Sequence, residues 1–343
     1  MLKELLAMSY ITTRVGEIVS PLHEHTERSK LHIFLKAPFG FTKTTEILEL
    51  QEKGLAHVVL EHSEAGLLGS AKAGVYYKGD IINGANKITV IDEYYLFETE
   101  ARRHLLTIMS HGFAKRTFHT FSKTAFSDRG DGWEVQGEQF GFTLKINTAI
   151  ALSTAVIEGK ADTILEMIQS RCFNLNYSFS KADALEMLSG EKKIERVKIK
   201  KIDFVDRVYL PEDVGKYLAE RIGELEIVPP DVGGYYMRAY WDMVKIASVY
   251  TVQDGRVDIT KDDVDKALIL YPLHSLGFIG NKLSKSEIEV YRHCRYKTAS
   301  QIAKEVGLSE VQVRRIIKRL KDMRIVKEIS YGGKIAYVNI LEI

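Results

Sequence analysis

Short apolar runs alternate with amphipathic segments through the first part of the chain. Residues 31–36 form an apolar run, and the spacing of residues 44–52 then predicts a helix. Residues 58–60 and 88–91 are further candidates for buried strands, and a helical pattern at 98–110 follows the second of them. Strands that alternate with helices are typical of a parallel sheet covered by helices. The sequence therefore predicts an α/β fold.

The pattern changes after residue 116. Residues 117–145 alternate polar and aromatic positions on either side of the turn-rich stretch 127–132, which predicts a long β-hairpin. Beyond it we expect a buried strand, a helix and then a helical region, in the order 148–155, 162–169, 211–223, 235–250 and 260–271. Thr260, with Asp263 three positions later, predicts the N-cap of the last of these helices.

The C-terminal residues show a separate and compact pattern. Residues 284–294, 298–306 and 310–323 predict three helices, with Ser284 and Ser309 as caps and Gly307 in the turn before the third. This is the spacing of a helix-turn-helix. Residues 324–329 and 335–340 then predict a two-stranded wing, so that the segment resembles a winged-helix domain. The segment 274–282, which contains Gly277 and Gly280, is predicted to be the linker before it.

Composition and charge narrow the class of protein only slightly. The 48 Lys and Arg residues and 46 Asp and Glu residues give a net charge of +2, so attraction to nucleic acid must come from local clusters. Cys172 and Cys294 are too few and too far apart for a zinc site or a disulfide framework. With no apolar stretch of membrane-spanning length, the chain is expected to be soluble, cytoplasmic and without a membrane partner.

Residues 37–44 lie at a predicted strand-to-helix turn, where phosphate groups commonly bind. Lys43 and Thr44 supply the amine for the phosphates and the hydroxyl for Mg²⁺ that such a site needs. The segment departs from the P-loop pattern, because Ala37 and Thr42 replace its two defining glycines. Taken alone, the segment also fits a lysine in the first turn of an ordinary helix.

Asp92 and Glu93 follow the predicted strand 88–91, and open α/β sheets bind ligands at this end of their strands. An aspartate here can hold Mg²⁺, and a glutamate can polarise the water that attacks the γ-phosphate. An acidic pair that begins a surface loop is the alternative. The order and spacing of the two segments together predict a site for ATP and Mg²⁺, with Thr44 and Asp92 as metal-binding residues.

These segments resemble the AAA+ ATPases of the MCM branch, which contains replicative helicases and relatives of origin initiators. In that family a small residue commonly precedes the lysine, as Thr42 does, and Gly40 matches an inner glycine. Residues 64–69 and 88–93 are similar to two further segments of the family. The resemblance implies an AAA+ P-loop core at residues 1–205, a helical lid at 206–275 and the winged helix at 282–343.

The resemblance also implies roles for residues outside the phosphate loop. The 117–145 hairpin would reach DNA, with Arg129 near its tip and Lys123 on one arm, although an ordinary solvated hairpin is the alternative. Thr154, or Ser153 beside it, would be the sensor-1 residue that positions the attacking water.

Two arginines are implied to act on the nucleotide. Arg171 would be an arginine finger inserted into the site of a neighbouring subunit, which implies a homo-oligomer or partner AAA+ subunits. Its alternative is an arginine that caps the end of a helix. Arg238 would be the sensor-2 residue of the lid.

The third C-terminal helix carries basic and polar residues on the face left exposed by its apolar stripe. With one residue of the wing, we expect them to face duplex DNA: Gln312, Arg314, Arg315, Lys318, Arg319 and Lys334. Such a face is often merely solvated, and some winged helices bind protein instead.

The sequence therefore predicts an ATP-dependent DNA-binding protein, an AAA+ ATPase related to helicases and replication initiators. Because the phosphate loop begins at residue 37, we do not expect the N-terminal region of the MCM family, and processive unwinding is expected to be lost with it. The alternatives are a non-hydrolysing regulator with a degenerate AAA+ domain, and a transcription factor whose large domain binds another ligand.

Overall fold

A computed structural model gives the structure of the chain. It describes residues 2–36, 43–72, 75–117, 133–138, 141–154, 163–176, 202–225, 233–280, 283–323 and 325–339.

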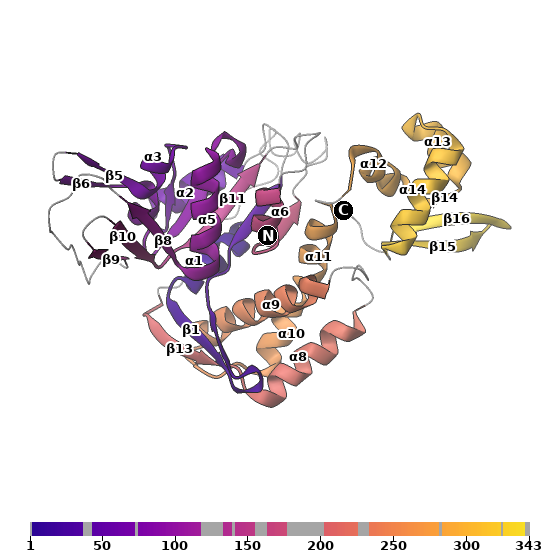
Figure 1. Cartoon of the computed structure of the whole chain (residues 1–343). Helices are drawn as coiled ribbons and strands as arrows, with labels where there is room; N and C mark the ends of the chain where they lie inside the picture. The colour runs from indigo at the N-terminus through magenta and orange to yellow at the C-terminus, as the bar shows by residue number, and fades with distance from the viewer. Residues whose placement is uncertain are drawn as a thin grey trace.

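A parallel sheet forms the centre of the larger part of the molecule (Figure 1). Its strands are β3 (Ile33–Lys36), β4 (Ala56–Val58), β7 (Ile88–Ile91), β11 (Ala149–Thr154) and β12 (Phe173–Asn176). They lie in the order β12-β3-β11-β7-β4, and every neighbouring pair is parallel. The prediction of an α/β fold with a parallel sheet is confirmed.

Both faces of this sheet are buried, and alternate residues of the three inner strands β3, β11 and β7 enter different hydrophobic clusters. In β7, Ile88 and Val90 join one cluster and Ile91 joins the other. The second cluster also contains Leu105 and Ile108 of the helix α5. The helices and the short 3₁₀ turn of this part are α2 (Lys43–Glu52), α3 (Glu64–Leu68), α4 (Asp80–Asn83), η2 (Tyr94–Leu96), α5 (Thr99–His111) and α6 (Thr163–Gln169).

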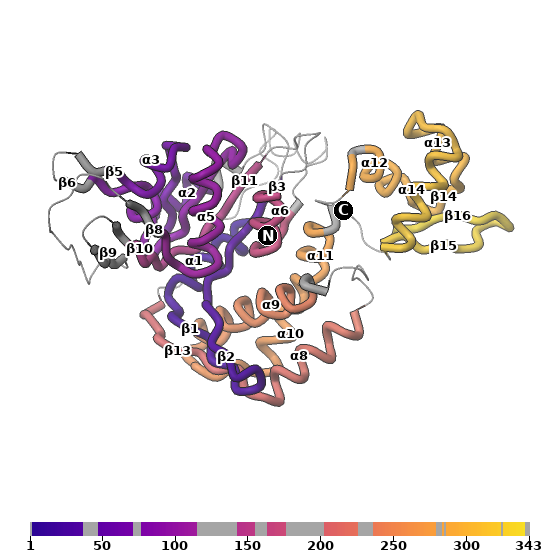
Figure 2. The backbone as a smooth tube through the Cα atoms, in the orientation of Figure 1, coloured from indigo at the N-terminus to yellow at the C-terminus, as the bar shows by residue number. Residues whose placement is uncertain are grey.

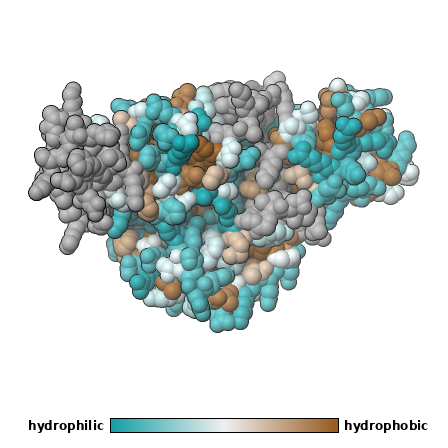
Figure 3. All heavy atoms as spheres, in the orientation of Figure 1, coloured by the Kyte–Doolittle hydropathy of each residue, from teal (hydrophilic) through white to brown (hydrophobic). Residues whose placement is uncertain are grey.

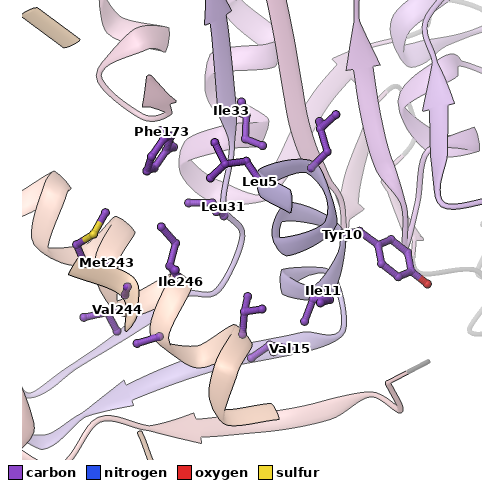
Figure 4. Packing of buried hydrophobic residues seen from close by; sticks show 14 of the residues in the cluster. Leu5, Tyr10, Ile11, Val15, Leu31, Ile33, Phe173, Met243, Val244 and Ile246 are labelled. Carbon is purple, nitrogen blue, oxygen red and sulfur yellow. The ribbon is translucent and has the colours of Figure 1, made fainter. Parts of the chain in front are cut away.

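The N-terminal residues, for which the sequence predicted no element, complete the first cluster. The helix α1 (Leu2–Thr12) packs between the sheet and the long helix α9 (Gly233–Gln253). Figure 4 shows Leu5 of α1 and Ile33 of β3 near Met243 and Ile246 of α9. This cluster includes residues on both sides of the boundary predicted between the core (1–205) and the lid (206–275). That division into two domains stays a prediction.

A second sheet joins the N-terminal segment to the later helices. Its strands are β1 (Val15–Ser20), β2 (His25–Arg28) and β13 (Val205–Tyr209), in the order β13-β1-β2. In the sequence, the 3₁₀ turn η1 (Pro21–His23) connects β1 to β2. Figure 2 shows β1 and β2 running from the parallel sheet down to the helices. These helices are α8 (Glu212–Glu224), α9, α10 (Lys261–Leu268) and α11 (Tyr271–Gly280). The predicted cap at Thr260 is confirmed, because Thr260 and Asp263 form a reciprocal capping box.

The predicted 117–145 hairpin is wrong in its pairing. The strands β8 (Phe113–Thr117), β9 (Trp133–Glu138) and β10 (Gly141–Ile146) form a sheet of order β8-β10-β9. The second predicted arm, 133–145, is therefore not one strand, because it contains β9 and β10, which pair with each other from Glu138 and Gly141 onward. The predicted first arm lies almost entirely outside the described residues. Residues 133–146 alone carry a complete hairpin pattern, which the turn-rich stretch before them obscured. A smaller hairpin consists of β5 (Gly69–Lys72) and β6 (Val75–Lys78).

The predicted linker at 274–282 is also wrong, because most of it belongs to the helix α11. Gly277 serves close packing, not flexibility. A Cβ atom at this position would clash with the backbone carbonyl of Asn174 in β12. The backbone amide of Asn174 also donates to Nδ1 of His274 in α11 at 3.0 Å. Burial lowers the pKa of His274 to about 3, so the ring is neutral and accepts this hydrogen bond.

The C-terminal residues form a compact unit with its own hydrophobic cluster. Its elements are α12 (Lys285–His293), β14 (Arg295–Lys297), α13 (Ala299–Val306), α14 (Glu310–Asp322), β15 (Val326–Tyr331) and β16 (Lys334–Asn339). The sheet is antiparallel in the order β14-β16-β15, so a third strand accompanies the two that were predicted. The predicted caps are confirmed: Ser284 and Ser309 each form a capping box.

Among the residues that the structure describes, no helix combines the length and the apolar character that crossing a membrane requires.

We predict that Gly277→Ala destabilises the protein by about 1–3 kcal/mol, because the added methyl group has no space between α11 and β12. Gly223 in α8 is the matched control, since nothing lies within 4 Å of a Cβ built there. Gly223→Ala is expected to be neutral or to stabilise by up to about 1 kcal/mol. Urea denaturation of both variants measures the two effects, and equal stabilities would contradict the close approach of α11 to β12.

Candidate nucleotide and nucleic-acid sites

The carboxyl ends of β3, β11 and β7 lie side by side at one edge of the parallel sheet. The register places Thr154 opposite Lys36 and Leu152 opposite Ile91. The residues that follow β7 are Asp92 and Glu93, so these acidic residues lie beside the end of β11. The sheet thus brings together three of the strand ends on which the sequence placed a nucleotide site.

A direct hydrogen bond connects two of these strand ends. The hydroxyl of Ser153 in β11 donates to Oδ1 of Asp92, which is half-buried after β7. Thr154, the residue expected to act as sensor 1, is buried at the end of the same strand, and its alternative Ser153 makes this contact. A carboxylate held by a neighbouring hydroxyl has a fixed orientation, which a metal-binding residue needs.

Glu93 has an unusual backbone conformation. Its φ and ψ of 62° and 57° lie in the left-handed region, immediately before the short turn η2. For a residue other than glycine this conformation costs roughly 1–2 kcal/mol. Such strain persists where the surroundings impose it, and it is often found at functional sites. The side chain of Glu93 is half-buried at the sheet edge.

Lys36 is a residue of this edge that the sequence analysis did not single out. It ends β3 directly before the proposed phosphate loop, and it is paired in register with Thr154 and Asn176. Burial lowers the pKa of its ammonium group. A lysine that ends an apolar run was the available signal, but the same pattern is common at the ends of ordinary strands.

The proposed phosphate loop falls mostly outside the described residues. Gly40 and Thr42 lie there entirely, whereas Lys43 and Thr44 begin α2 but their side chains are not among the described atoms. The position of α2 itself is fixed farther along. Glu49 of α2 forms an ion pair of 2.7 Å with Lys3 of α1, and hydrogen bonds from Lys3 and Lys53 lower the pKa of Glu49 to about 2.

Arg171 and Arg238, predicted to act on the nucleotide in different ways, meet at one turn. Arg238 of α9 donates to both the carbonyl and the hydroxyl oxygen of Ser170, just after α6. Arg171 donates from Nε to the hydroxyl of Ser110 at 2.5 Å and from Nη1 to the carbonyl of Met167 at 2.6 Å. Burial, and secondly the charge of Arg238, lowers the pKa of Arg171. Both guanidinium groups are only half-buried.

The DNA-facing residues proposed on α14 are exposed, but they differ in their contacts. Arg314 forms an ion pair with Glu310, and the side-chain oxygen of Gln312 accepts from Ser309 in the capping box. Arg319 forms an ion pair with the buried carboxylate of Glu287 in α12, in which Nη1 and Oε1 are 2.5 Å apart. All three side chains therefore have structural contacts. The spacing of Ser309 with Gln312 and of Glu310 with Arg314 is visible in the sequence, whereas the pair of Arg319 with Glu287 is not.

The remaining proposed residues, Arg315 and Lys318 on α14 and Lys334 at the start of β16, are exposed to solvent. Figure 3 shows that hydrophilic surface covers much of the C-terminal unit. Lys123 and Arg129, proposed for the hairpin, lie outside the described residues.

We predict that Glu93→Gly is more stable than Glu93→Ala by about 1 kcal/mol, because glycine adopts the left-handed conformation without a steric penalty. Both variants lack the carboxylate, so the comparison isolates the backbone. Thermal and chemical unfolding measure the difference. If Glu93→Ala is the more stable variant, Glu93 does not have a left-handed backbone conformation.

In comparisons with known proteins, the chain matches no protein-family model and no curated protein.

Proposed function

We propose that the protein is a P-loop ATPase of the AAA+ type, similar to the MCM branch, that couples ATP binding and hydrolysis to DNA binding. One observation carries this proposal. β11 separates β3, which leads toward Lys43, from β7, which leads into Asp92 and Glu93. In the proposed site, the residue that positions the attacking water lies between Lys43 and the acidic pair. The end of β11, with Ser153 and Thr154, is located between the two strands that lead to them.

The residues present fit Mg²⁺ and a triphosphate. Asp92 offers a carboxylate oriented by Ser153, and oxygen donors of this kind are those that Mg²⁺ prefers. In the proposed site, Thr44 and Asp92 hold the metal, and Lys43 with the amides of the loop around Gly40 and Thr42 binds the phosphates. Mg²⁺, when bound, neutralises charge that develops on the phosphate oxygens. Glu93 polarises the attacking water, and Thr154 or Ser153 positions it.

The pair of Arg171 and Arg238 fits a role at a neighbouring subunit's site. Two guanidinium groups that share one turn repel each other, and an anion placed between them would relieve that repulsion. Because both groups are half exposed, a phosphate presented by another subunit can approach them. Arg171 would then stabilise charge in the transition state, and Arg238 would bind phosphate in the same way. This arrangement requires a homo-oligomer or a partner AAA+ subunit.

The C-terminal unit is proposed to be a winged helix that binds duplex DNA. In it, α14 would enter the major groove, and the β15–β16 hairpin would be the wing. Arg315, Lys318 and Lys334 are exposed basic residues suited to phosphate contacts. Arg314, Arg319 and Gln312 would contribute only after exchanging their present contacts for DNA.

We predict that Glu93→Gln abolishes ATP hydrolysis but preserves ATP binding, since it removes the base while keeping the shape of the side chain. Lys43→Ala is expected to weaken ATP binding itself. Steady-state hydrolysis with DNA present, together with calorimetry of Mg-ATP binding, separates the two effects. If the wild-type protein shows neither turnover nor nucleotide binding, the ATPase proposal is wrong and the alternative, a non-hydrolysing regulator with a degenerate AAA+ domain, is favoured.

We further predict that Arg171→Ala is inactive alone but regains activity when mixed with Glu93→Gln. In a mixed oligomer, the intact Glu93 of one variant meets the intact Arg171 of the other. Random mixing of equal amounts restores up to about a quarter of wild-type hydrolysis. An arginine that acts within its own subunit, or merely caps a helix, would give no recovery.

For DNA binding, we predict that Lys318→Ala weakens binding to all sequences alike and lowers the dependence of affinity on salt by about one counterion. The free energy of unfolding of Lys318→Ala should stay close to that of the wild-type protein. Arg319→Ala is the comparison, because it leaves the buried Glu287 without its ion pair across α12 and α14 and should also lower the unfolding midpoint. Anisotropy titrations at several salt concentrations test both. Unchanged affinity in Lys318→Ala would exclude α14 as the DNA-facing helix.

A further inference from the structure

Two tyrosine rings lie exposed next to each other on the sheet of the C-terminal unit. Tyr296 belongs to β14 and Tyr331 ends β15, and their ring centroids are 5.6 Å apart at an interplanar angle of 52°. The exposed fractions are 57% for Tyr296 and 61% for Tyr331. Other tyrosines of this unit, Tyr291 and Tyr337, are buried in its hydrophobic cluster. The exposed pair therefore adds little to the core.

Local backbone geometry presents both rings to solvent. Tyr296 has a φ of 59°, at a point where the pairing of β14 with β16 shifts register between Arg295 and Lys297. A bulge of this kind re-aims a side chain, and the left-handed conformation costs a bulky residue free energy. Tyr331 directly precedes the tight turn Gly332-Gly333, whose φ values of 58° and 73° are those of a two-residue hairpin turn.

A lysine lies next to the pair, and a hollow begins at that lysine. Lys334 lies opposite Tyr331 in the hairpin register. Lys334 and Ile335 also line a hollow that continues to Thr298 and Ser300 at the start of α13 and to the ion pair of Arg314 with Glu310 in α14. Ile335 is itself 57% exposed. Cationic and hydroxyl groups suit a phosphate backbone, whereas flat exposed rings beside them suit nucleobases.

We propose that Tyr296 and Tyr331 form a stacking platform for unpaired nucleobases, so that the C-terminal unit recognises DNA where a duplex ends or opens. This inference rests on the proposed DNA binding and specifies its substrate class. Lys334 and the hydroxyl groups of Thr298 and Ser300 hold the sugar-phosphate backbone, and the rings contact bases released from the duplex. An intact duplex keeps its bases stacked and leaves the rings without a partner.

The test compares a blunt duplex with the same duplex carrying a single-stranded extension, in anisotropy titrations of the full chain. Wild type is expected to bind the extended duplex at least about fivefold more tightly, as stacking of one base on an aromatic ring implies. Tyr331→Ala and Tyr296→Ala should lose this preference, whereas Tyr331→Phe should retain it because the ring remains. Tyr209→Ala is the matched control, since Tyr209 is an exposed tyrosine in β13, outside this unit.

The outcomes distinguish this inference from the function on which it rests. Binding of neither DNA by wild type would refute the proposed DNA binding. Equal binding of both DNAs, or a preference that survives Tyr331→Ala, would overturn the stacking platform alone. Sedimentation completes the experiment: if Tyr331→Ala dissociates an oligomer without changing the DNA preference, the rings contact a second copy of the chain and the proposal is wrong.

Discussion

Burial of the parallel sheet on both faces is the constraint from which the rest of the structure follows. Because alternate residues of β7 and β11 enter opposite hydrophobic clusters, a slip of one residue would move each side chain into the other cluster, where it no longer matches its packing partners. The register is therefore fixed, and with it the positions of the residues that follow each strand. The contact between Ser153 and Asp92 is a consequence of this register. The candidate site is thus positioned by the core.

The same core joins the sheet to the helices that follow it in the chain. α1 packs against α9, and Asn174 of β12 contacts His274 of α11, so a displacement of these helices alters the surroundings of the sheet. Arg238 extends this connection from α9 to Ser170, beside Arg171. A ligand that binds between subunits at this arginine pair would act on both parts at once. This connection gives the proposed ATPase a physical route from nucleotide state to helix position.

The sequence predicts best where the pattern is local and repeated. The buried strand 88–91, the amphipathic helices and the capping boxes at Ser284 and Ser309 follow from periodicity and side-chain chemistry. Prediction from the sequence fails where tertiary contacts decide the role of a residue. Gly277 was interpreted as a linker residue, but the approach of α11 to β12 requires it; the register of β10 cannot be found from turn residues alone. Arg319 was predicted to contact DNA, but it forms an ion pair with Glu287 of α12, which only the folded structure brings close to it.

The central claim is that one edge of the sheet binds a triphosphate between the start of α2 and the acidic pair after β7. A crystal structure with Mg²⁺ and a non-hydrolysable ATP analogue tests it most directly. We predict phosphate density at the first turn of α2, with Lys43 on the phosphates and Asp92 on the metal. Density at another surface, or a crystal grown at saturating analogue in which this edge stays without nucleotide, would contradict the account.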